Sequence, residues 1–571
     1  MKDTRVGRER VLAIIIMIFT SVYIIAKWNL RKILFSRVRY QSITRLHVTD
    51  LTNGTLSGYQ RRDSYALVLG ICLMTLPLAT ILHSKGEMKM TIVGTKEQEE
   101  IWNDMENGDS HMVVKAGAGT GKTFTIVEGA KRISGGKKGF LAFNKSIATE
   151  LGKKLPLDCK AMTFHSLGLS SIKRFRKDAK VDTKKTYNII RNIFGPEYKS
   201  APALNKLISL LKSSLADWQS ISDIRAIIDQ YNIEFDGIKD EKMAIDMLPT
   251  MRNMCEDISV VDFDDMIWLP VVLELPVEHY DTVFVDEAQD FNESQRQLIL
   301  RACNGGRMIV VGDTKQAIYG FRGADSASMD IFREELVNKS TRGVKDYTLS
   351  ITWRCPKSIV AEANRFFSDY TCREDAPEGE VNVNAAFVPK GGDLVLCRVN
   401  APLVSECFSL ITQGIPAYVL GRDIGYSLQV LVKKVTDDSS MTLERFLPAL
   451  ADHVDKRINA LKLQEKDKQI QSLTDKHDCI LALAGNVNTV GGLLDNIKEI
   501  FGEQGKKAGV VFSTIHKAKG LEAENVWILE PQLMPHPMAT TPADRQQETN
   551  LCYVAITRAM KTLNYVGDRV G

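Results

Sequence analysis

The chain has 571 residues and a formal net charge of +4 at pH 7. Residues 1–89 contain 14 Lys and Arg against 5 Asp and Glu, a net charge of +9. The chain totals are 74 and 70, so the rest of the chain has 60 basic and 65 acidic residues and a net charge of −5. This excludes nucleic-acid binding through bulk charge, so any such affinity needs a local track of basic and aromatic side chains and should weaken with salt. The ten cysteines form no CxxC pair and have no histidine partner at zinc spacing, which indicates no zinc or iron–sulfur site and fits a reducing cytoplasm.

The first 89 residues form a hydrophobic and basic leader. Val11–Ala26 is an uncharged run of 16 residues and Ser64–Ser84 is one of 21, with a basic segment between them. One interpretation is a membrane hairpin with a positive cytoplasmic loop, which would place the rest of the chain outside the cytoplasm. A second is that Met90 is the true start, because in a bacterial or viral gene the codons of Lys85–Met90 can contain a ribosome-binding sequence. A cleaved targeting segment is the third.

A phosphate-binding loop is predicted at AGAGTGKT. Its small residues lead into a Lys and a Thr, so that backbone N–H groups face phosphates, the Lys122 ammonium reaches the β and γ oxygens, and the Thr123 hydroxyl binds Mg²⁺. The strict pattern has Gly at the first position, where this chain has Ala116. The predicted ATP-binding loop consists of Ala116, Gly117, Ala118, Gly119, Thr120, Gly121, Lys122 and Thr123.

The apolar run TVFVDEAQD, Thr282–Asp290, supplies the second half of the predicted site. A carboxylate at the end of a strand, Asp286, suits the water shell of the metal, and Glu287 beside it can orient or deprotonate an attacking water. Together the two motifs predict ATP hydrolysis with ATP and Mg²⁺ as cofactors.

Short apolar runs alternate with helical patterns around these motifs. The runs are HMVVKA, GFLAFN, AMTFHS and RMIVVGD, followed by DLVLCR, AYVLG, VVFST and NVWILE. This alternation predicts an α/β chain with parallel sheets covered by helices, in two tandem domains. Lys122 and Asp286 lie too far apart for one crossover, and helical spacing in NIIRNIF and LNKLISLLKSSL predicts a helical insertion at 170–254.

Further motifs indicate which ATPase this is. In chain order they are TKEQ, AFNKSIATEL, TFHSLG, DFDDMI, VVGDTKQAIYGFRGAD, LSITWRCP, FSTIHKAKGLEAENV and NLCYVAITRAM. In order and content they resemble the superfamily 1A DNA helicases of the UvrD/Rep type, with wording closest to the phage and F-box-helicase-like branch. The resemblance covers about Thr91–Val566. It implies two tandem RecA-like P-loop NTPase domains, at 90–169 with 255–340 and at 341–425 with 508–571, and a reduced helical insertion at 426–507.

Several ATP-site roles follow from side-chain chemistry. Gln316, just past a strand end, can sense the γ-phosphate, and guanidinium groups from a second domain, Arg354 and Arg558, can neutralise a transferring phosphoryl group. The resemblance supports these roles and that of Glu287. It adds Gln98 reading the adenine edge, Trp353 stacking on the base and Glu522 holding the ribose.

Single-stranded DNA is expected to stack on aromatic side chains along a groove that also contacts phosphates. Tyr319, Phe321 and Arg322 follow the Gln316 sensor directly, which would link hydrolysis to the DNA grip. By resemblance, further DNA contacts come from Asn144, Thr163, His165, His516 and Lys517. Bacterial members often have an aromatic residue one position before Phe143, so whether Phe143 stacks on a base stays open.

The sequence therefore predicts an ATP-dependent DNA helicase or translocase that moves 3′ to 5′, as the resemblance implies. A translocase that strips proteins from single strands is one alternative, and a membrane-tethered ATPase without DNA dependence is another. Expected partners are single-stranded and tailed duplex DNA, with possible single-strand-binding or recombination proteins. The expected location is the cytoplasm, of the host if the source is viral, with a membrane contact only if the leader is genuine.

Overall fold

The computed structural model describes residues 94–142, 144–231, 233–318, 327–463, 467–501 and 509–569. All three interpretations of the leader, the membrane hairpin, the start at Met90 and the cleaved targeting segment, concern residues outside these ranges. The predicted DNA contacts Tyr319, Phe321 and Arg322, and also Phe143, lie outside them as well. Within the described ranges, no helix combines the length and the apolar character needed to cross a membrane.

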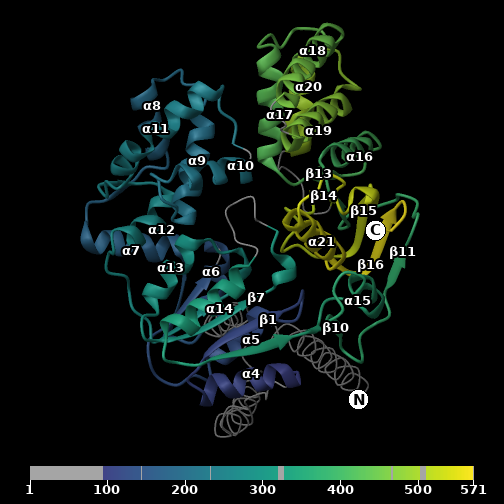
Figure 1. Ribbon diagram of the computed structural model, residues 1–571. Coiled ribbons are helices and arrows are strands. Elements are labelled where there is room, and N and C mark those ends of the chain that lie inside the picture. The colour runs from purple at the N-terminus through teal and green to yellow at the C-terminus, as the bar shows by residue number, and fades with distance from the viewer. Residues whose placement is uncertain are drawn as a thin grey trace, which may run out of the picture. The chain divides into compact units, whose positions relative to one another are not determined.

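A six-stranded sheet lies at the centre of the first α/β domain (Figure 1). All of its strand pairs are parallel, in the order β3-β2-β6-β7-β1-β8. Its strands are β1 (His111–Ala116), β2 (Lys138–Ala142), β3 (Cys159–Thr163), β6 (Thr282–Val285), β7 (Arg307–Gly312) and β8 (Val344–Leu349). The predicted runs HMVVKA, GFLAFN, AMTFHS and RMIVVGD fall on β1, β2, β3 and β7, so the parallel α/β prediction is confirmed.

Both faces of this sheet are buried because successive side chains of each strand point to opposite sides. In β1, Val113 belongs to one core and its neighbour Val114 to another. The helices of this domain are α4 (Lys96–Asn107), α5 (Lys122–Ala130), α6 (Lys145–Leu151), α7 (Phe164–Phe175), α12 (Phe263–Val272), α13 (Glu293–Ala302) and α14 (Ser328–Lys339).

A helical insertion separates α7 from α12 and has its own apolar core. It comprises β4 (Lys180–Val181), α8 (Lys185–Phe194), α9 (Ala201–Ser214), α10 (Ile221–Gln230), α11 (Ile238–Cys255) and β5 (Val260–Val261). Buried ion pairs fix it to α12: Asp265 lies 2.7 Å from Lys185 Nζ and 2.8 Å from Lys212 Nζ. Two cations facing one buried carboxylate give α12 a defined position beside the sheet, because either charge alone would be costly to bury.

A second parallel sheet has the order β11-β16-β15-β12-β14-β13. Its strands are β11 (Glu380–Asn382), β12 (Leu394–Cys397), β13 (Ala417–Val419), β14 (Val510–Thr514), β15 (Ala523–Leu529) and β16 (Ala559–Val566). The helices α15 (Lys357–Ala363), α16 (Ala401–Thr412) and α21 (Pro542–Ile556) accompany it, and β9 (Ile351–Thr352) pairs with β10 (Thr371–Cys372) before it. The two sheets are the tandem RecA-like pair expected from the sequence.

The second insertion is an all-helical bundle in the described residues (Figure 1). It comprises α17 (Arg422–Val435), α18 (Leu443–Lys462), α19 (Asp467–Ala484) and α20 (Val490–Phe501). Its apolar side chains share one core with a face of the second sheet, which includes Val395 and Phe512. The residue boundaries predicted for the domains and insertions stay predictions.

The carboxyl ends of parallel strands meet at one edge of a sheet, where ligands bind in open α/β folds. Along this edge of the first sheet, β3 ends at Thr163, β2 at Ala142, β6 at Val285, β7 at Gly312 and β1 at Ala116. The residues that follow these strands are the ones that the sequence motifs single out. The fold therefore gathers the motifs at one edge.

Candidate functional site

The phosphate loop joins β1 to α5 and turns on two glycines in the left-handed region. Gly119 has φ 67° and Gly121 has φ 82°, a conformation that side chains disfavour. A Cβ at Gly119 would also come within 2.6 Å of the Cβ of Arg354. Lys122 opens α5, so the loop and the helix N-terminus together present backbone N–H groups suited to phosphate oxygens.

Thr123 and Asp286 meet at the expected metal position. The Thr123 hydroxyl donates a 2.7 Å hydrogen bond to Asp286 Oδ2, although the two residues are 163 positions apart. Burial, together with the charge of Glu287, raises the pKa of Asp286 to about 6. A hydroxyl and a carboxylate are the oxygen ligands that Mg²⁺ uses with phosphates and water, so these residues fit that ion.

Glu287 adopts a left-handed backbone conformation, φ 56°, which is uncommon for a residue with a side chain. Gln289 Nε2 donates to Glu287 Oε2 at 2.6 Å, and Gln289 Oε1 accepts from the Asp313 N–H at 2.9 Å. Burial opposes the charge on Glu287, but Lys122 and Lys519 outweigh it and lower the pKa. The carboxylate is therefore both oriented and ionised.

The predicted sensor Gln316 lies in η2 (Thr314–Gln316), just after β7. Its Nε2 donates to Asp313 Oδ2 at 2.7 Å, and Lys122 Nζ lies 3.9 Å from the same oxygen. Burial raises the pKa of Asp313. One buried carboxylate thus connects the sensor amide to the lysine of the phosphate loop.

Lys519, in the KAKG motif, also binds residues of this region, although no role was predicted for it from the sequence. Its Nζ lies 2.8 Å from Asp290 Oδ1 and donates to the Gln316 carbonyl at 2.7 Å. A cation from the second sheet thus binds the sensor segment through its backbone. The sequence did contain a signal for this residue: Lys519 lies between the predicted DNA contacts His516 and Lys517 and the predicted ribose residue Glu522.

The two predicted arginine fingers differ in their surroundings. Arg354 Nε donates to Glu522 Oε2 at 2.7 Å, so it is paired with the residue predicted to hold the ribose. Arg558 is 1 % exposed and donates to the Val554 carbonyl at 2.9 Å and the Leu521 carbonyl at 3.1 Å. Burial and the nearby Arg354 charge lower the pKa of Arg558 to about 10. Its charge in turn helps to lower the pKa of Glu287, so Arg558 acts on the candidate hydrolysis site.

Gln98 and Trp353 both contact the phosphate loop region. Gln98 completes a capping box with Thr95, and its Nε2 donates to Thr125 Oγ1 on α5 at 3.0 Å. The backbone N–H of Trp353 donates to the Gly119 carbonyl at 2.9 Å, while its side chain is 49 % exposed. The Arg373 guanidinium lies 4.6 Å from the centroid of the indole ring. An exposed aromatic ring and a buried amide thus flank the loop where a base is expected.

Asn144 and Thr163 follow the paired strands β2 and β3. Each caps the helix that begins there: Asn144 Oδ1 accepts from the Ile147 N–H at 2.9 Å, and Thr163 forms a capping box with Ser166. The register pairs Ala142 with Thr163, so these two helix starts are neighbours at the sheet edge. Helix N-termini with polar caps are suited to phosphate groups of a nucleic-acid backbone.

His165 packs edge-on against Phe263, with ring centroids 5.6 Å apart and an interplanar angle of 89°. Burial lowers the pKa of His165, which favours the neutral ring. Phe263 is 54 % exposed at the start of α12, although it is a large apolar side chain. Phe263 belongs to the motif DFDDMI, but no role was predicted for it from the sequence. An aromatic residue between helix-capping aspartates was the available signal.

His516 lines a cavity of about 1060 Å³. Its lining comes from both sheet domains and from both insertions, and includes Tyr231, Arg296, Arg398, Gln471 and Gln547. Lys517, next to His516, forms an ion pair with Asp423 at the start of α17 and so lies at the junction with the second insertion. Among the residues that the structure describes, the predicted DNA contacts therefore occupy two regions, one around His165 and one around His516 and Lys517.

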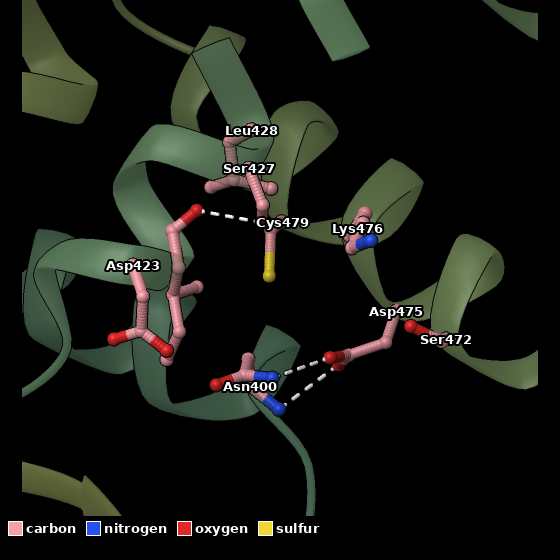
Figure 2. A pocket seen from close by; sticks show the side chains of 9 residues that line it. Asn400, Asp423, Ser427, Leu428, Ser472, Asp475, Lys476 and Cys479 are labelled. Atoms are coloured by element: carbon pink, nitrogen blue, oxygen red, sulfur yellow. Dashed lines mark hydrogen bonds between the residues drawn. The ribbon is translucent and has the colours of Figure 1, made fainter. Parts of the chain in front are cut away.

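A smaller cavity of about 240 Å³ shares Asn400 and Asp475 with the large one (Figure 2). In Figure 2 the two side chains point toward each other, and Asp475 Oδ2 accepts from Asn400 Nδ2 at 2.7 Å. Asp475 Oδ1 also accepts from the Ala401 N–H at 2.8 Å, which satisfies the first turn of α16. This contact joins α19 of the insertion to the second sheet domain beside the large cavity.

Comparison with known proteins gives two family matches. Residues 95–336 match the model described as the UvrD/REP helicase N-terminal domain, and residues 430–566 match the UvrD-like helicase C-terminal domain. F-box DNA helicase protein 1 of Schizosaccharomyces pombe is 25 % identical over 541 residues, covering 85 % of this chain and 59 % of that protein. F-box DNA helicase 1 of Gallus gallus is 23 % identical over 536 residues, 84 % of this chain and 49 % of that protein.

A bacterial relative matches a smaller part of the chain. ATP-dependent DNA helicase PcrA of Bacillus subtilis is 23 % identical over 300 residues, covering 47 % of this chain and 38 % of that protein. The chain thus spans about half the length of the curated relatives named here.

Proposed function

The chain belongs to the UvrD-like helicase family, and we propose on this basis that it is an ATP-dependent DNA helicase that moves 3′ to 5′ on single-stranded DNA and unwinds duplex. One observation carries the proposal. Along the carboxyl edge of the first sheet, the candidate DNA residues Asn144, Thr163 and His165 lie at the ends of β2 and β3, while candidate ATP residues follow β6, β7 and β1. A rigid sheet with both sets on one edge can transmit a change at the phosphates to the strand contacts.

The phosphate loop and α5 would bind the triphosphate, with Lys122 against the β and γ oxygens. Mg²⁺ would be held by Thr123 and Asp286, and when bound it neutralises charge on the phosphates and orients them. The 2.7 Å hydrogen bond between these two side chains supports a shared ligand position.

Glu287 would accept a proton from the water that attacks the γ-phosphorus, as the bond to the bridging oxygen of ADP breaks. Its lowered pKa keeps it ionised, and Gln289 fixes one of its oxygens. Lys122, Arg354 and Arg558 would neutralise the charge that spreads over the transferring phosphoryl group. Arg354 and Arg558 belong to segments that follow the first sheet in the chain, and the charge of Arg558 already helps to lower the pKa of Glu287.

Nucleotide binding would also change the partner of Arg354. Glu522 Oε2 accepts a hydrogen bond from Arg354 Nε at 2.7 Å. When the ribose hydroxyls take the Glu522 carboxylate, the guanidinium is released toward the phosphates. This exchange would couple binding of the sugar to delivery of the finger.

DNA binding would involve two sets of residues. Asn144, Thr163, His165 and Phe263 would contact the strand at the first sheet, and His516 with Lys517 would contact it at the second. The segment of Tyr319, Phe321 and Arg322 stays a predicted stacking site just beyond the sensor. Lys519 supports a coupled movement, because it binds the Gln316 carbonyl from the second domain.

The test is the ATPase rate of the full chain with and without single-stranded DNA, with Lys122→Ala as the blank, followed by strand separation on 3′-tailed and 5′-tailed duplexes. The proposal expects strong stimulation by DNA and separation of the 3′-tailed substrate. Displacement of a bound protein without strand separation would instead support a stripping translocase. An ATPase rate indifferent to DNA would contradict both and favour the membrane-tethered ATPase.

A further inference from the structure

Ala118, the third residue of the phosphate loop, is fully buried in the core of the second sheet domain. Both of its backbone polar groups are bound by tyrosine hydroxyls. The Ala118 N–H donates to Tyr553 Oη at 2.9 Å, and the Ala118 carbonyl accepts from the Tyr370 hydroxyl at 2.7 Å. Tyr553 lies on α21, and Tyr370 lies just before β10. The second domain thus binds the phosphate loop at one residue, through both its N–H and its carbonyl group.

These two hydroxyls come from fixed positions. Tyr553 and Tyr370 are 0 % and 1 % exposed, and their rings pack edge-on with centroids 5.5 Å apart. Asn364 binds both backbone groups of Tyr370, donating to its carbonyl at 2.7 Å and accepting from its N–H at 3.3 Å. Burial raises the pKa of both tyrosines well above 10, so both hydroxyls keep their protons.

The neighbouring loop residues make further backbone contacts. The Gly117 N–H donates to the Leu349 carbonyl at 2.9 Å, and the Gly119 carbonyl accepts from the Trp353 N–H at 2.9 Å. A Cβ at Gly117 would come within 3.0 Å of the Tyr370 ring. The loop therefore has little freedom to change shape while the two domains are in contact.

One helix connects this contact with two others. On α21, Asn550 is 2 % exposed and its Nδ2 donates to the Ala317 carbonyl at 2.9 Å, next to the sensor Gln316. Tyr553 follows three residues later, and Arg558 lies just beyond the helix end. A helix is stiff over this length, so Asn550, Tyr553 and Arg558 keep fixed distances from one another. When α21 is docked, it therefore also fixes the distances between the sensor segment, the phosphate loop and Arg558.

We propose that Tyr370 and Tyr553 are positioning residues. They set the shape of the phosphate loop while the second sheet domain contacts it, so that ATP turnover depends on docking of α21. The inference rests on the proposed ATP hydrolysis. The hydroxyls bind the backbone of Ala118, so they act on the reaction through the loop. Loss of an interaction that acts only in the transition state lowers kcat and kcat/KM together. Loss of one that stabilises bound substrate and transition state equally raises KM instead.

The experiment replaces Tyr553 with Phe in the full chain, which removes only the hydroxyl. Tyr565→Phe is the matched control, because Tyr565 is 0 % exposed in the same core and its hydroxyl donates to Glu362 Oε1 at 3.1 Å, away from the loop. With saturating single-stranded DNA, we expect Tyr553→Phe to lower kcat and kcat/KM for ATP by about tenfold, with KM unchanged within about twofold. Tyr565→Phe should keep the kcat and KM of the unsubstituted chain.

Tyr370→Phe provides a second variant in case Tyr553→Phe does not fold, as judged by circular dichroism and thermal unfolding. The double variant should lose less kcat than the product of the two single losses, because both hydroxyls hold the same residue. An active parent chain with unchanged kcat in Tyr553→Phe and Tyr370→Phe would overturn the positioning role. An equal loss in Tyr565→Phe would also overturn it, as a general effect of core stability. A parent chain without any ATPase activity would overturn the proposed function itself.

Discussion

Arg354 and Glu522 form an ion pair, with Arg354 Nε 2.7 Å from Glu522 Oε2. The Glu522 side chain is 49 % exposed, and an ion pair at such a position contributes about 0.2–1 kcal/mol. A pair of this strength can be exchanged for a ligand at little cost. The residue proposed for the ribose and the residue proposed as a finger are therefore partners in one ion pair.

Glu522→Gln tests the ribose role. Loss of the carboxylate should raise KM for ATP by about tenfold, equivalent to about 1.4 kcal/mol of a charge-assisted hydrogen bond, with kcat within about twofold. Steady-state ATPase kinetics with DNA give both constants. Glu524→Gln, at an exposed glutamate on β15 two positions after Glu522, is the control and should change neither. An unchanged KM in Glu522→Gln would remove Glu522 from the nucleotide site.

Glu287→Gln tests the proposed base. The amide keeps the shape of the side chain but cannot accept the proton of water, so kcat should fall by about a hundredfold or more while ATP still binds. Fluorescent ATP binding and phosphate release separate the two effects. Lys122→Ala should instead lose binding and hydrolysis together. Normal turnover in Glu287→Gln would refute its role as base.

Phe263→Ala tests the exposed ring beside His165. If Phe263 stacks on a base, its loss should weaken single-stranded DNA binding by about 1–3 kcal/mol and raise the DNA concentration needed to stimulate ATP hydrolysis. Fluorescence anisotropy with a labelled oligonucleotide measures the affinity. Phe175→Ala is the matched control, because this ring is 65 % exposed at the far end of α7. Equal DNA affinity of the two variants would show that Phe263 is an exposed apolar residue without a role in DNA binding.

His111 predicts acid sensitivity of the first sheet. It is 3 % exposed on β1, and burial, with the charges of Arg342 and Arg307, lowers its pKa from 6.5 to about 4. Its Nδ1 accepts from the Met308 N–H at 3.0 Å, which requires the unprotonated nitrogen. Because the folded-state pKa lies below the unfolded value, this contribution is fully present above pH 6.5 and is lost as pH falls toward 4.

Urea unfolding at several pH values measures this effect. Between pH 7 and pH 4.5, His111→Gln should lose less unfolding free energy than the parent chain, by about 1–3 kcal/mol. The carboxylates titrate in both proteins and cancel in the difference. An identical pH dependence would show that His111 has the same pKa in the folded and unfolded chains.

Local patterns in the sequence were sufficient for the strands and for the phosphate loop. Apolar runs such as HMVVKA become strands of a parallel sheet that is buried on both faces, with Lys115 as the one exposed residue of β1. The glycines of AGAGTGKT permit the left-handed turns at Gly119 and Gly121. Spacing also predicted that Asp286 and Glu287 would end a strand. The roles proposed for these side chains stay predictions until the variants are measured.

The tertiary structure alone decided which distant residues meet. Three contacts join segments that lie from about 100 to more than 400 positions apart in the chain. Arg354 pairs with Glu522, Tyr370 and Tyr553 bind Ala118, and the exposed ring of Phe263 packs beside His165. Strand order and the packing of α21 fix these contacts, and neither is encoded in the periodicity of a single segment. Sequence by itself thus determined the local chemistry, while the order of the parallel strands determined which chemistries act together.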